Sequence, residues 1–272
     1  MAISVKSERE IGLMRQSCKL IEEVHDELGR MIRPGISTLD IDRLGEKLIR
    51  ERGGIPNFLN YNGYPASICV SVNDEVVHGI PNKHRILKNG DIVSLDAGLI
   101  YKGYHSDAAR TYAVGNISPE RKLLIDRTRQ AFFEGIRFAR EGCFLHEISN
   151  AIDAYISQFG YGIVRDLVGH GIGTKLHEDP QIPNFKQLRR GPKLRAGMTL
   201  AIEPMINLGC YEVAWLDDDW TVVTEDEEPS AHYENTVLIT KDKPEILTLS
   251  SASFAAYDNR EVLAWCDLRK EV

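Results

Sequence analysis

The sequence lacks the features that would direct a protein into or across a membrane. No run approaches the roughly 20 apolar residues of a membrane-spanning helix, and the first ten residues hold no apolar stretch like that of a secretory signal peptide. The five cysteines are odd in number, widely scattered and without a CxxC pair, which disfavours a disulfide framework or a thiolate zinc site. We therefore expect a cytoplasmic protein with reduced thiols and no membrane partner.

Blocks of Lys and Arg are also missing. The 33 basic residues are outnumbered by 40 acidic ones, and the formal net charge of −7 argues against a dedicated nucleic-acid-binding protein. The motifs of P-loop NTPases, GxSxG hydrolases, HExxH metalloproteases and dinucleotide-binding folds are absent as well. What is present is a chain of 272 residues, 43% of them apolar, which is long enough to bury a sizeable core.

Helix signals open the chain. Ser7 and Glu10 form a capping-box pair, and the apolar residues that follow at helical spacing predict a helix that ends before Pro34-Gly35. A second helix is predicted from Ser37 to the Gly53-Gly54 pair. Two β-rich runs come next, at residues 67–72 and 91–96, with turn signals beside them.

The same order returns in the second half. Ser118-Pro119 predicts the start of a long helix that ends near Gly142, and a shorter helix then runs to Gly160, before strands that continue to about Leu249. A shift of 107 residues aligns the two halves. The aligned positions are Arg33, Gly35, Ile41 and Gly53 with Arg140, Gly142, Ile148 and Gly160, and the segment Leu87–Asp96 with Leu194–Glu203. We therefore expect an α+β fold in which two pseudo-symmetric α/β halves form one domain, each with an acid at the end of a buried strand.

Two aspartates lie around a predicted hairpin. Asp96 follows the apolar run 92–95, and Asp107 lies eleven residues further on, past the turn candidates 101–103. A hairpin centred between residues 101 and 102 would place the two carboxylates opposite each other on one face. A cation between them would remove both their repulsion and the cost of burying unpaired charge. The alternative, strongest for Asp107, is that one or both are exposed turn acids.

Two further acids and one histidine complete a candidate site. Glu203 ends the apolar run 198–202, and Glu234 precedes the β-rich run 236–240. His170 is flanked by glycines in Gly169-His-Gly-Ile-Gly173, which leaves its imidazole accessible, although a structural histidine is the alternative reading. Four carboxylates with one nitrogen ligand would suit a hard divalent metal. His78 and His177 are additional candidates, but neither has a carboxylate neighbour that makes the case alone.

Together these residues resemble the methionine aminopeptidases of the single-domain bacterial type. The order Asp96, Asp107, His170, Glu203, Glu234 matches the ligand order of that family, and the surrounding words match as well: Val77-His-Gly-Ile-Pro81, Gly103-Tyr-His-Ser-Asp107, Gly169-His-Gly-Ile-Gly173, His177-Glu-Asp-Pro180, Ile202-Glu-Pro-Met205 and Tyr233-Glu-Asn-Thr-Val237. The resemblance implies the pita-bread fold, with two pseudo-twofold halves around a central antiparallel sheet. It implies a single catalytic domain over residues 1–249 and leaves the tail 250–272 without a role.

The resemblance also implies a two-metal mechanism. Two divalent ions (Co, Mn, Fe or Zn) would lie side by side, bridged by Asp107 and Glu234, with Asp96 on one ion and His170 and Glu203 on the other. A metal-bridging hydroxide would attack the peptide bond, and Glu203 would carry a proton to the leaving nitrogen.

Further roles for named side chains follow from the same resemblance. His177 is expected to stabilise the developing oxyanion, and His78 to contact the substrate backbone beyond the cleaved bond. The methionine pocket would be lined by Tyr61, Tyr64, Cys69 and Trp220. Three positions depart from the common family pattern: Phe58, which could narrow or cover that pocket, and His232 and Asn235, which flank Glu234.

The implied activity is removal of the initiator methionine from nascent proteins and peptides whose second residue is small. The expected setting is a monomer in the cytoplasm, transiently near the ribosome and without nucleic-acid binding. One alternative is a proline-specific peptidase of the prolidase or aminopeptidase P type, which the short stretch before Asp96 disfavours because those relatives carry an extra domain there. The other is a metal-free binding module, which the complete ligand set and the acidic charge disfavour.

Overall fold

The computed structural model describes residues 3–250, 254 and 266–270. The α-helices are α1 (Glu8–Met31), α2 (Thr38–Glu51), α3 (Pro119–Ile136) and α4 (Leu145–Ile156), with 3-10 turns η1 (Tyr61–Gly63) and η2 (Ser157–Phe159). The strands are β1 (Ile55–Pro56), β2 (Ile68–Val72), β3 (Glu75–Val77), β4 (Ile92–Tyr101), β5 (Tyr104–Ala113), β6 (Gly162–Ile163), β7 (Gly169–Gly171), β8 (Glu178–Ile182), β9 (Thr199–Ile202), β10 (Met205–Asn207), β11 (Val213–Trp215), β12 (Val222–Thr224), β13 (Ser230–His232), β14 (Glu234–Leu238), β15 (Glu245–Ile246) and β16 (Asp267–Leu268).

The first helix begins where the sequence predicts it. The Ser7 hydroxyl accepts a hydrogen bond from the Glu10 N–H, and the Glu10 carboxylate accepts one from the Ser7 N–H, so the capping box is confirmed. The third helix, however, ends at Ile136, six residues before the predicted end at Gly142. The N–H groups of Glu141 and Gly142 donate to the carbonyl groups of Thr240 and Leu194 instead of continuing the helix. Tertiary pairing therefore overrides the local helical pattern.

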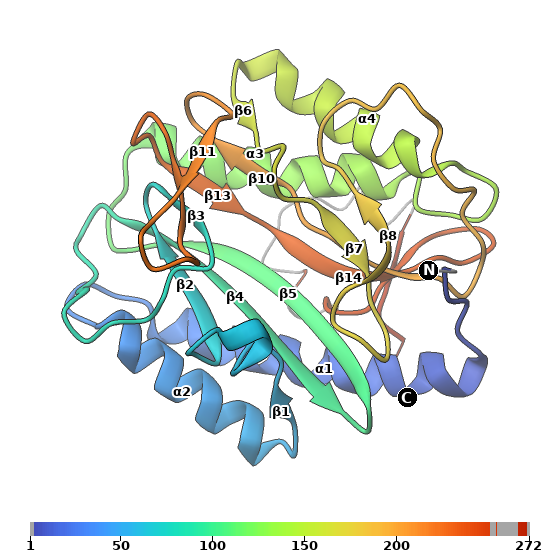
Figure 1. The fold of residues 1–272 in the computed structure, drawn as a ribbon, viewed down its shortest axis with the longest axis horizontal. Helices are drawn as coiled ribbons and strands as arrows, with labels where there is room; N and C mark the ends of the chain where they lie inside the picture. Colours follow the sequence, from blue (N-terminus) through green and yellow to red (C-terminus); the bar gives the residue numbers. More distant parts are fainter. Residues whose placement is uncertain (1–2, 251–253, 255–265, 271–272) are drawn as a thin grey trace.

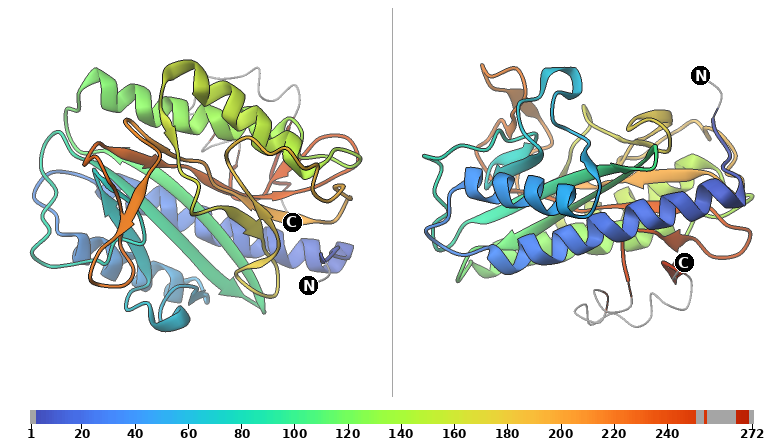
Figure 2. Two further views of the ribbon diagram at one scale, coloured as in Figure 1. Left: turned by 45° about the horizontal axis from the view of Figure 1, so that its top comes forward. Right: turned by 90° about the horizontal axis from the view of Figure 1, so that it is seen from below.

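A ten-stranded sheet carries the fold, with its main path in the order β1-β4-β5-β14-β9-β7-β8. Helices α1 and α2 pack against the strands of the first half, and α3 and α4 against those of the second half, as Figure 1 shows. Each half has its own apolar core, with Ile21, Leu48 and Leu95 in one, and Phe132 and Leu200 in the other. The right-hand view of Figure 2 shows α1 running along the sheet.

Hydrogen bonds repeat with the predicted shift of 107 residues. The Gly35 N–H donates to the Leu87 carbonyl at 2.8 Å, and the Gly142 N–H donates to the Leu194 carbonyl at 3.1 Å. The isolated bridges repeat in the same way, Ser37 with Ile86 and Phe144 with Lys193. These contacts confirm the internal repeat and the pseudo-twofold arrangement of the halves.

The β4–β5 hairpin has a different register from the predicted one. Tyr101 pairs with Tyr104 across a two-residue turn whose residues, Lys102 and Gly103, both have positive φ, at 49° and 84°. Asp107 therefore faces Gly98 instead of Asp96, and the prediction that the two aspartates pair directly was wrong. Because the register differs by two positions, the carboxylates still share one face of the ladder, as diagonal neighbours.

The last described residues pack against the body of the domain. Strand β16 pairs in parallel with β15, and Arg269, which follows it, forms a buried ion pair with Glu22 of α1. The predicted boundary at residue 249 thus lies before residues that contact the domain. Among the described residues, no helix combines the length and the apolar character needed to cross a membrane.

Candidate active site

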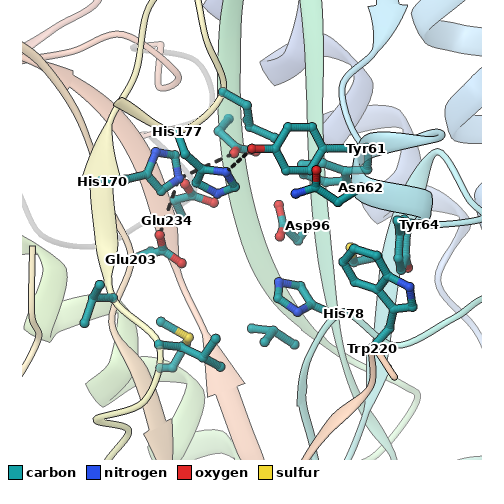
Figure 3. Close-up of a pocket in the computed structure, with 18 residues that line it drawn as sticks. Tyr61, Asn62, Tyr64, His78, Asp96, His170, His177, Glu203, Trp220 and Glu234 are labelled. Carbon is teal, nitrogen blue, oxygen red and sulfur yellow. Dashed lines mark hydrogen bonds and ion pairs between the residues drawn. The ribbon is translucent and has the colours of Figure 1, made fainter. Parts of the chain in front are cut away.

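A cavity of about 250 Å³ opens on the sheet where the two halves meet. Every side chain that the sequence singles out for binding or catalysis lines it: Tyr61, Tyr64, Cys69, His78, Asp96, Asp107, His170, His177, Glu203, Trp220 and Glu234. Figure 3 shows His170, His177, Glu203 and Glu234 gathered on one side, with Tyr64, His78 and Trp220 on the other. The cavity therefore has an ionisable side and an aromatic side.

Neighbouring strands bring the five candidate ligands together. Asp96 lies on β4, Asp107 on β5, Glu234 begins β14, Glu203 follows β9 directly, and His170 lies on β7. His170 Nε2 lies 3.6 Å from Glu203 Oε1 and 3.9 Å from Asp107 Oδ2. One ligand atom each from Asp107, His170 and Glu234 lie within 4.8 Å of one another, a separation that one metal ion could span.

Burial opposes the charge of all four carboxylates. It raises the pKa of Asp96 to about 7, with the nearby charge of Glu203 adding to the shift. The pKa of Asp107 is also raised well above its usual value, first by burial and then by the charges of Asp96 and Glu203. Burial likewise raises the pKa values of Glu203 and Glu234. Four charged carboxylates in one cavity would repel each other. A bound cation would stabilise their charged form.

Unpartnered oxygen atoms point to the same conclusion. Among the described residues, Asp96 Oδ1, Asp107 Oδ1 and Glu234 Oε1 are buried without a hydrogen-bond partner. Buried polar atoms are normally hydrogen-bonded, so three orphaned carboxylate oxygens in one cavity require a partner of another kind. Divalent metal ions fit this donor set of oxygens with one imidazole.

The orientation of His170 suits a metal ligand. Its Nδ1–H donates to the carbonyl of Gly171 at 2.9 Å, which leaves the lone pair of Nε2 directed at the carboxylates. Burial lowers the pKa of His170 to about 3, so the ring is neutral near pH 7. The flanking glycines are required by close packing, because a Cβ at Gly171 would lie 2.2 Å from the Asp179 carbonyl oxygen.

His177 and His78 lie on opposite sides of the cavity (Figure 3). The Tyr61 hydroxyl and His177 Nδ1 are 2.7 Å apart, and burial lowers the pKa of His177. His78 has a φ of 60°, a left-handed conformation that non-glycine residues rarely adopt and that is concentrated at functional sites. Its ring lies edge-on to Trp220, with centroids 6.2 Å apart, and burial lowers its pKa to about 4.

The aromatic side is fixed by its own contacts. The Tyr64 hydroxyl donates to the Gly79 carbonyl at 2.9 Å, and the rings of Tyr64 and Trp220 meet edge to face with centroids 5.2 Å apart. Cys69 pairs with Asp96 in the ladder, and burial raises the pKa of its thiol, which stays neutral. Phe58 also lines the cavity, so this departure from the family pattern forms part of the wall.

Sequence reasoning missed part of the cavity. The further lining residues are Asn62, Val77, Leu167, Val168, Leu176 and Met205. Val77 and Met205 lie inside the matched motifs, whereas Val168 and Leu176 directly adjoin two others, and this proximity is the only signal that could have found them. The sequence does not reveal which surface an apolar loop residue faces.

Comparison with known proteins decides the family. The profile of metallopeptidase family M24 matches residues 12–241. The chain belongs to this family. Within M24 it is similar to a methionine aminopeptidase from Clostridium acetobutylicum, with 52% identity over 247 residues that cover 91% of this chain and 99% of that protein. A Bacillus subtilis methionine aminopeptidase is 48% identical over 90% of this chain and 99% of its own length.

Solved structures of the M24 family give the same result for the fold. The methionine aminopeptidase from Thermotoga maritima superposes with a TM-score of 0.90 at 41% identity, covering 92% of this chain and 100% of that one. The prolidase from Pyrococcus furiosus has a TM-score of 0.72 at 21% identity, and the match covers 91% of this chain but 66% of that one. The fold of this protein is therefore the pita-bread fold of the family. The protein is a peptidase of the methionine aminopeptidase type.

Proposed function

We propose that the protein hydrolyses the peptide bond after an N-terminal methionine, in peptides and nascent chains whose second residue is small. The observation that carries the proposal is the division of the cavity. A buried group of carboxylates and one imidazole, suited to metal ions, faces an aromatic pocket of Tyr64, Cys69 and Trp220. Such a pocket suits an unbranched thioether side chain, because sulfur makes favourable contacts with aromatic rings.

Two divalent ions would be held by the ionisable side of the cavity. Asp107 and Glu234 would contact both ions, Asp96 one of them, and His170 with Glu203 the other. When bound, such ions polarise a carbonyl and lower the pKa of water enough for attack at neutral pH. Which of Co, Mn, Fe or Zn serves depends on supply as well as on ligand type.

Glu203 is the proposed proton carrier of the reaction. Burial raises the pKa of its carboxyl above the usual value, and a carboxylate placed beside the attacking water can accept a proton and release it again. The Glu203 carboxylate would accept a proton from the attacking water and pass it to the leaving nitrogen. Its place directly after β9 positions it on the side of the cavity that holds His170.

His177 would stabilise the negative charge that develops on the carbonyl oxygen of the cleaved bond. Its Nδ1 accepts a hydrogen bond from the Tyr61 hydroxyl in our assignment, which places the ring proton on Nε2. That N–H is then free to donate to an oxyanion in the cavity. His78, across the cavity, would contact the substrate backbone beyond the cleaved bond, and Phe58 would narrow the methionine pocket.

The setting of the reaction is part of the same proposal. We propose a monomer that acts in the cytoplasm on nascent chains near the ribosome. Residues 1–249 would form the catalytic domain. The family profile, which matches residues 12–241, supports a boundary in this region.

A comparison of two peptides tests the proposed substrate. The enzyme is stripped of metal with a chelator, and cleavage of Met-Ala-Ser and of Ala-Pro-Ser is measured with and without added Mn²⁺ or Co²⁺. We expect metal-dependent release of methionine from Met-Ala-Ser and no cleavage before proline. Cleavage of the proline peptide alone would contradict the proposal and favour a prolidase-type activity.

Replacement of one ligand tests the proposed metal site. Asp107→Ala removes a carboxylate that is common to both proposed ions, so we expect hydrolysis of Met-Ala-Ser and Mn²⁺ binding to fall by at least about 100-fold. The circular dichroism spectrum should be unchanged, because the variant also relieves repulsion within a buried group of acids. Full activity in Asp107→Ala would overturn the assignment of the ligands.

A further inference from the structure

His232 lies behind the proposed metal ligands with a fixed backbone. Its N–H donates to the Thr111 hydroxyl oxygen at 2.9 Å, and the same hydroxyl donates to the His232 carbonyl at 2.9 Å. Strand β13 also pairs with β10, where His232 faces Met205. With the main chain held on both sides, the direction in which the imidazole leaves the strand is set.

The imidazole is buried against one carboxylate. The side chain is 1% exposed, and among the described residues neither ring nitrogen has a hydrogen-bond partner. The Nε2 atom lies 3.5 Å from Glu203 Oε2, while the other carboxylate oxygen, Oε1, lies 3.6 Å from His170 Nε2. Glu203 is thus held between two imidazoles, one on each oxygen.

Distance identifies Glu203 as the partner of His232, because its Oε2 atom lies 3.5 Å from the ring nitrogen. The other charged groups that act on the ring are Asp96 and Arg110. A neutral imidazole carries a single N–H, which either ring nitrogen can hold. A buried N–H without a partner destabilises the fold. The Glu203 carboxylate is an acceptor that the ring N–H reaches after a small shift of either side chain.

We propose that His232 is a positioning residue for Glu203, donating a hydrogen bond from Nε2–H to Oε2. This bond leaves Oε1 directed towards His170 and the proposed metal site. Partners of this kind orient a ligating carboxylate and strengthen metal binding without touching the metal. The inference rests on the proposed function for its kinetic consequences, but its effect on metal binding does not depend on the substrate.

Two amide variants separate the hydrogen bond from the bulk of the side chain. The amide nitrogen of Gln occupies about the position of the imidazole Nε2, whereas the amide of Asn reaches only as far as Nδ1. His232→Gln can therefore still donate to Glu203, and His232→Asn cannot. Both variants keep a polar side chain, and thermal unfolding followed by circular dichroism shows that each is folded before it is assayed.

The readouts are Mn²⁺ binding to the metal-free enzyme by titration calorimetry, and kcat and KM for Met-Ala-Ser. We expect His232→Asn to weaken Mn²⁺ binding about 10-fold and to lower kcat about 10- to 100-fold, the range found for partners of metal ligands. KM should change little, because His232 does not line the methionine pocket. His232→Gln should stay close to the wild type in both readouts.

His146→Gln is the matched control. His146 also has a buried Nδ1 without a hydrogen-bond partner among the described residues, but it belongs to α4 and lies outside the cavity. Its replacement should leave Mn²⁺ binding and kcat unchanged. Wild-type behaviour of His232→Asn would overturn the proposal, and so would a His232→Gln variant as impaired as His232→Asn. Failure of the proposed function would show instead as an inactive wild type that still binds Mn²⁺.

Discussion

Buried imidazoles in this protein are neutral, and their neutrality has consequences for stability. Burial lowers the pKa of His25, His78, His170 and His232, although they lie in different parts of the fold. At His170 the neutral ring keeps a lone pair for the proposed metal. At His25, which lies on α1 and does not line the cavity, the Nε2–H donates to the Ala108 carbonyl at 2.7 Å and ties the helix to β5.

His25 is predicted to make the protein sensitive to mild acid. Burial lowers its pKa from 6.5 to about 3, so the unfolded chain takes up a proton that the folded chain refuses. The stabilisation is therefore complete above pH 6.5 and falls by about 1.4 kcal/mol per pH unit as the pH drops from 6.5 towards 3. The free energy of unfolding is measured in urea at equal metal content. Between pH 7 and pH 5 it should fall by about 2 kcal/mol more for the wild type than for His25→Gln.

The exposed His84 supplies the control for this measurement. His84→Gln should show the same acid dependence as the wild type, because replacing an exposed side chain leaves the buried surroundings of His25 unchanged. If the free energies of unfolding of the wild type and of His25→Gln change in parallel with pH, the lowered pKa of His25 does not govern stability in acid.

At the scale of single elements, the β4–β5 hairpin shows what the sequence can and cannot predict. The apolar run before Asp96 and the turn residues after it predict a hairpin with both aspartates on one face. The register depends on which two residues take positive φ, and Lys102 is not a residue that signals this conformation. The shared face was predicted correctly because side chains alternate with a period of two, whereas the pairing was not.

The register of this hairpin places Gly98 opposite Asp107, where any larger residue would crowd the Asp107 carboxylate. A Cβ at Gly98 would lie 2.4 Å from Asn57 Nδ2 and 2.9 Å from Asp107 Oδ1, both closer than real contacts allow. Gly98→Ala is therefore predicted to displace the carboxylate, lowering activity on Met-Ala-Ser at least about 10-fold and stability by about 1–3 kcal/mol. Activity assays and urea unfolding measure the two effects separately.

Gly103 in the turn of the same hairpin is the matched control. It has a φ of 84°, and nothing lies within 4 Å of a Cβ built there. Gly103→Ala should cost about 1–2 kcal/mol for its left-handed conformation while leaving activity intact. An equal loss of activity in both variants would mean that the hairpin acts only through overall stability.

For the molecule as a whole, the internal repeat was predictable and the packing between its copies was not. The repeat shows in the sequence because the same glycine and apolar positions return after 107 residues, and equivalent hydrogen bonds require them. The candidate ligands could be predicted because each lies in a short sequence motif at or beside a strand. The wall formed by Leu167 and Leu176 could not, since these residues approach the cavity only through tertiary packing.

The C-terminal segment is predicted to stabilise the fold without serving catalysis. Arg269 forms a buried ion pair with Glu22 of α1. Arg269→Met removes one partner of a buried charge, which we expect to cost about 3 kcal/mol and to lower the melting temperature by roughly 6–12 °C. Activity on Met-Ala-Ser at 25 °C should be unchanged, because the pair does not line the cavity.

Lys270 provides the comparison for Arg269. Its side chain is exposed, and its contact with Glu245 is made by the backbone N–H, which Lys270→Met retains. This variant should melt within about 2 °C of the wild type, as surface substitutions usually do. If Arg269→Met melts no lower than Lys270→Met, the tail does not contribute to stability through its ion pair.

The division of the candidate ligands between the two halves has a consequence for synthesis. Asp96 and Asp107 come from the first half, whereas His170, Glu203 and Glu234 come from the second. A growing chain that has emerged only as far as residue 200 presents two aspartates and one histidine, without the last two acids. Under the proposed assignment, a chain that ends before residue 234 lacks at least one ligand, so the complete metal site can form only when most of the chain has been synthesised.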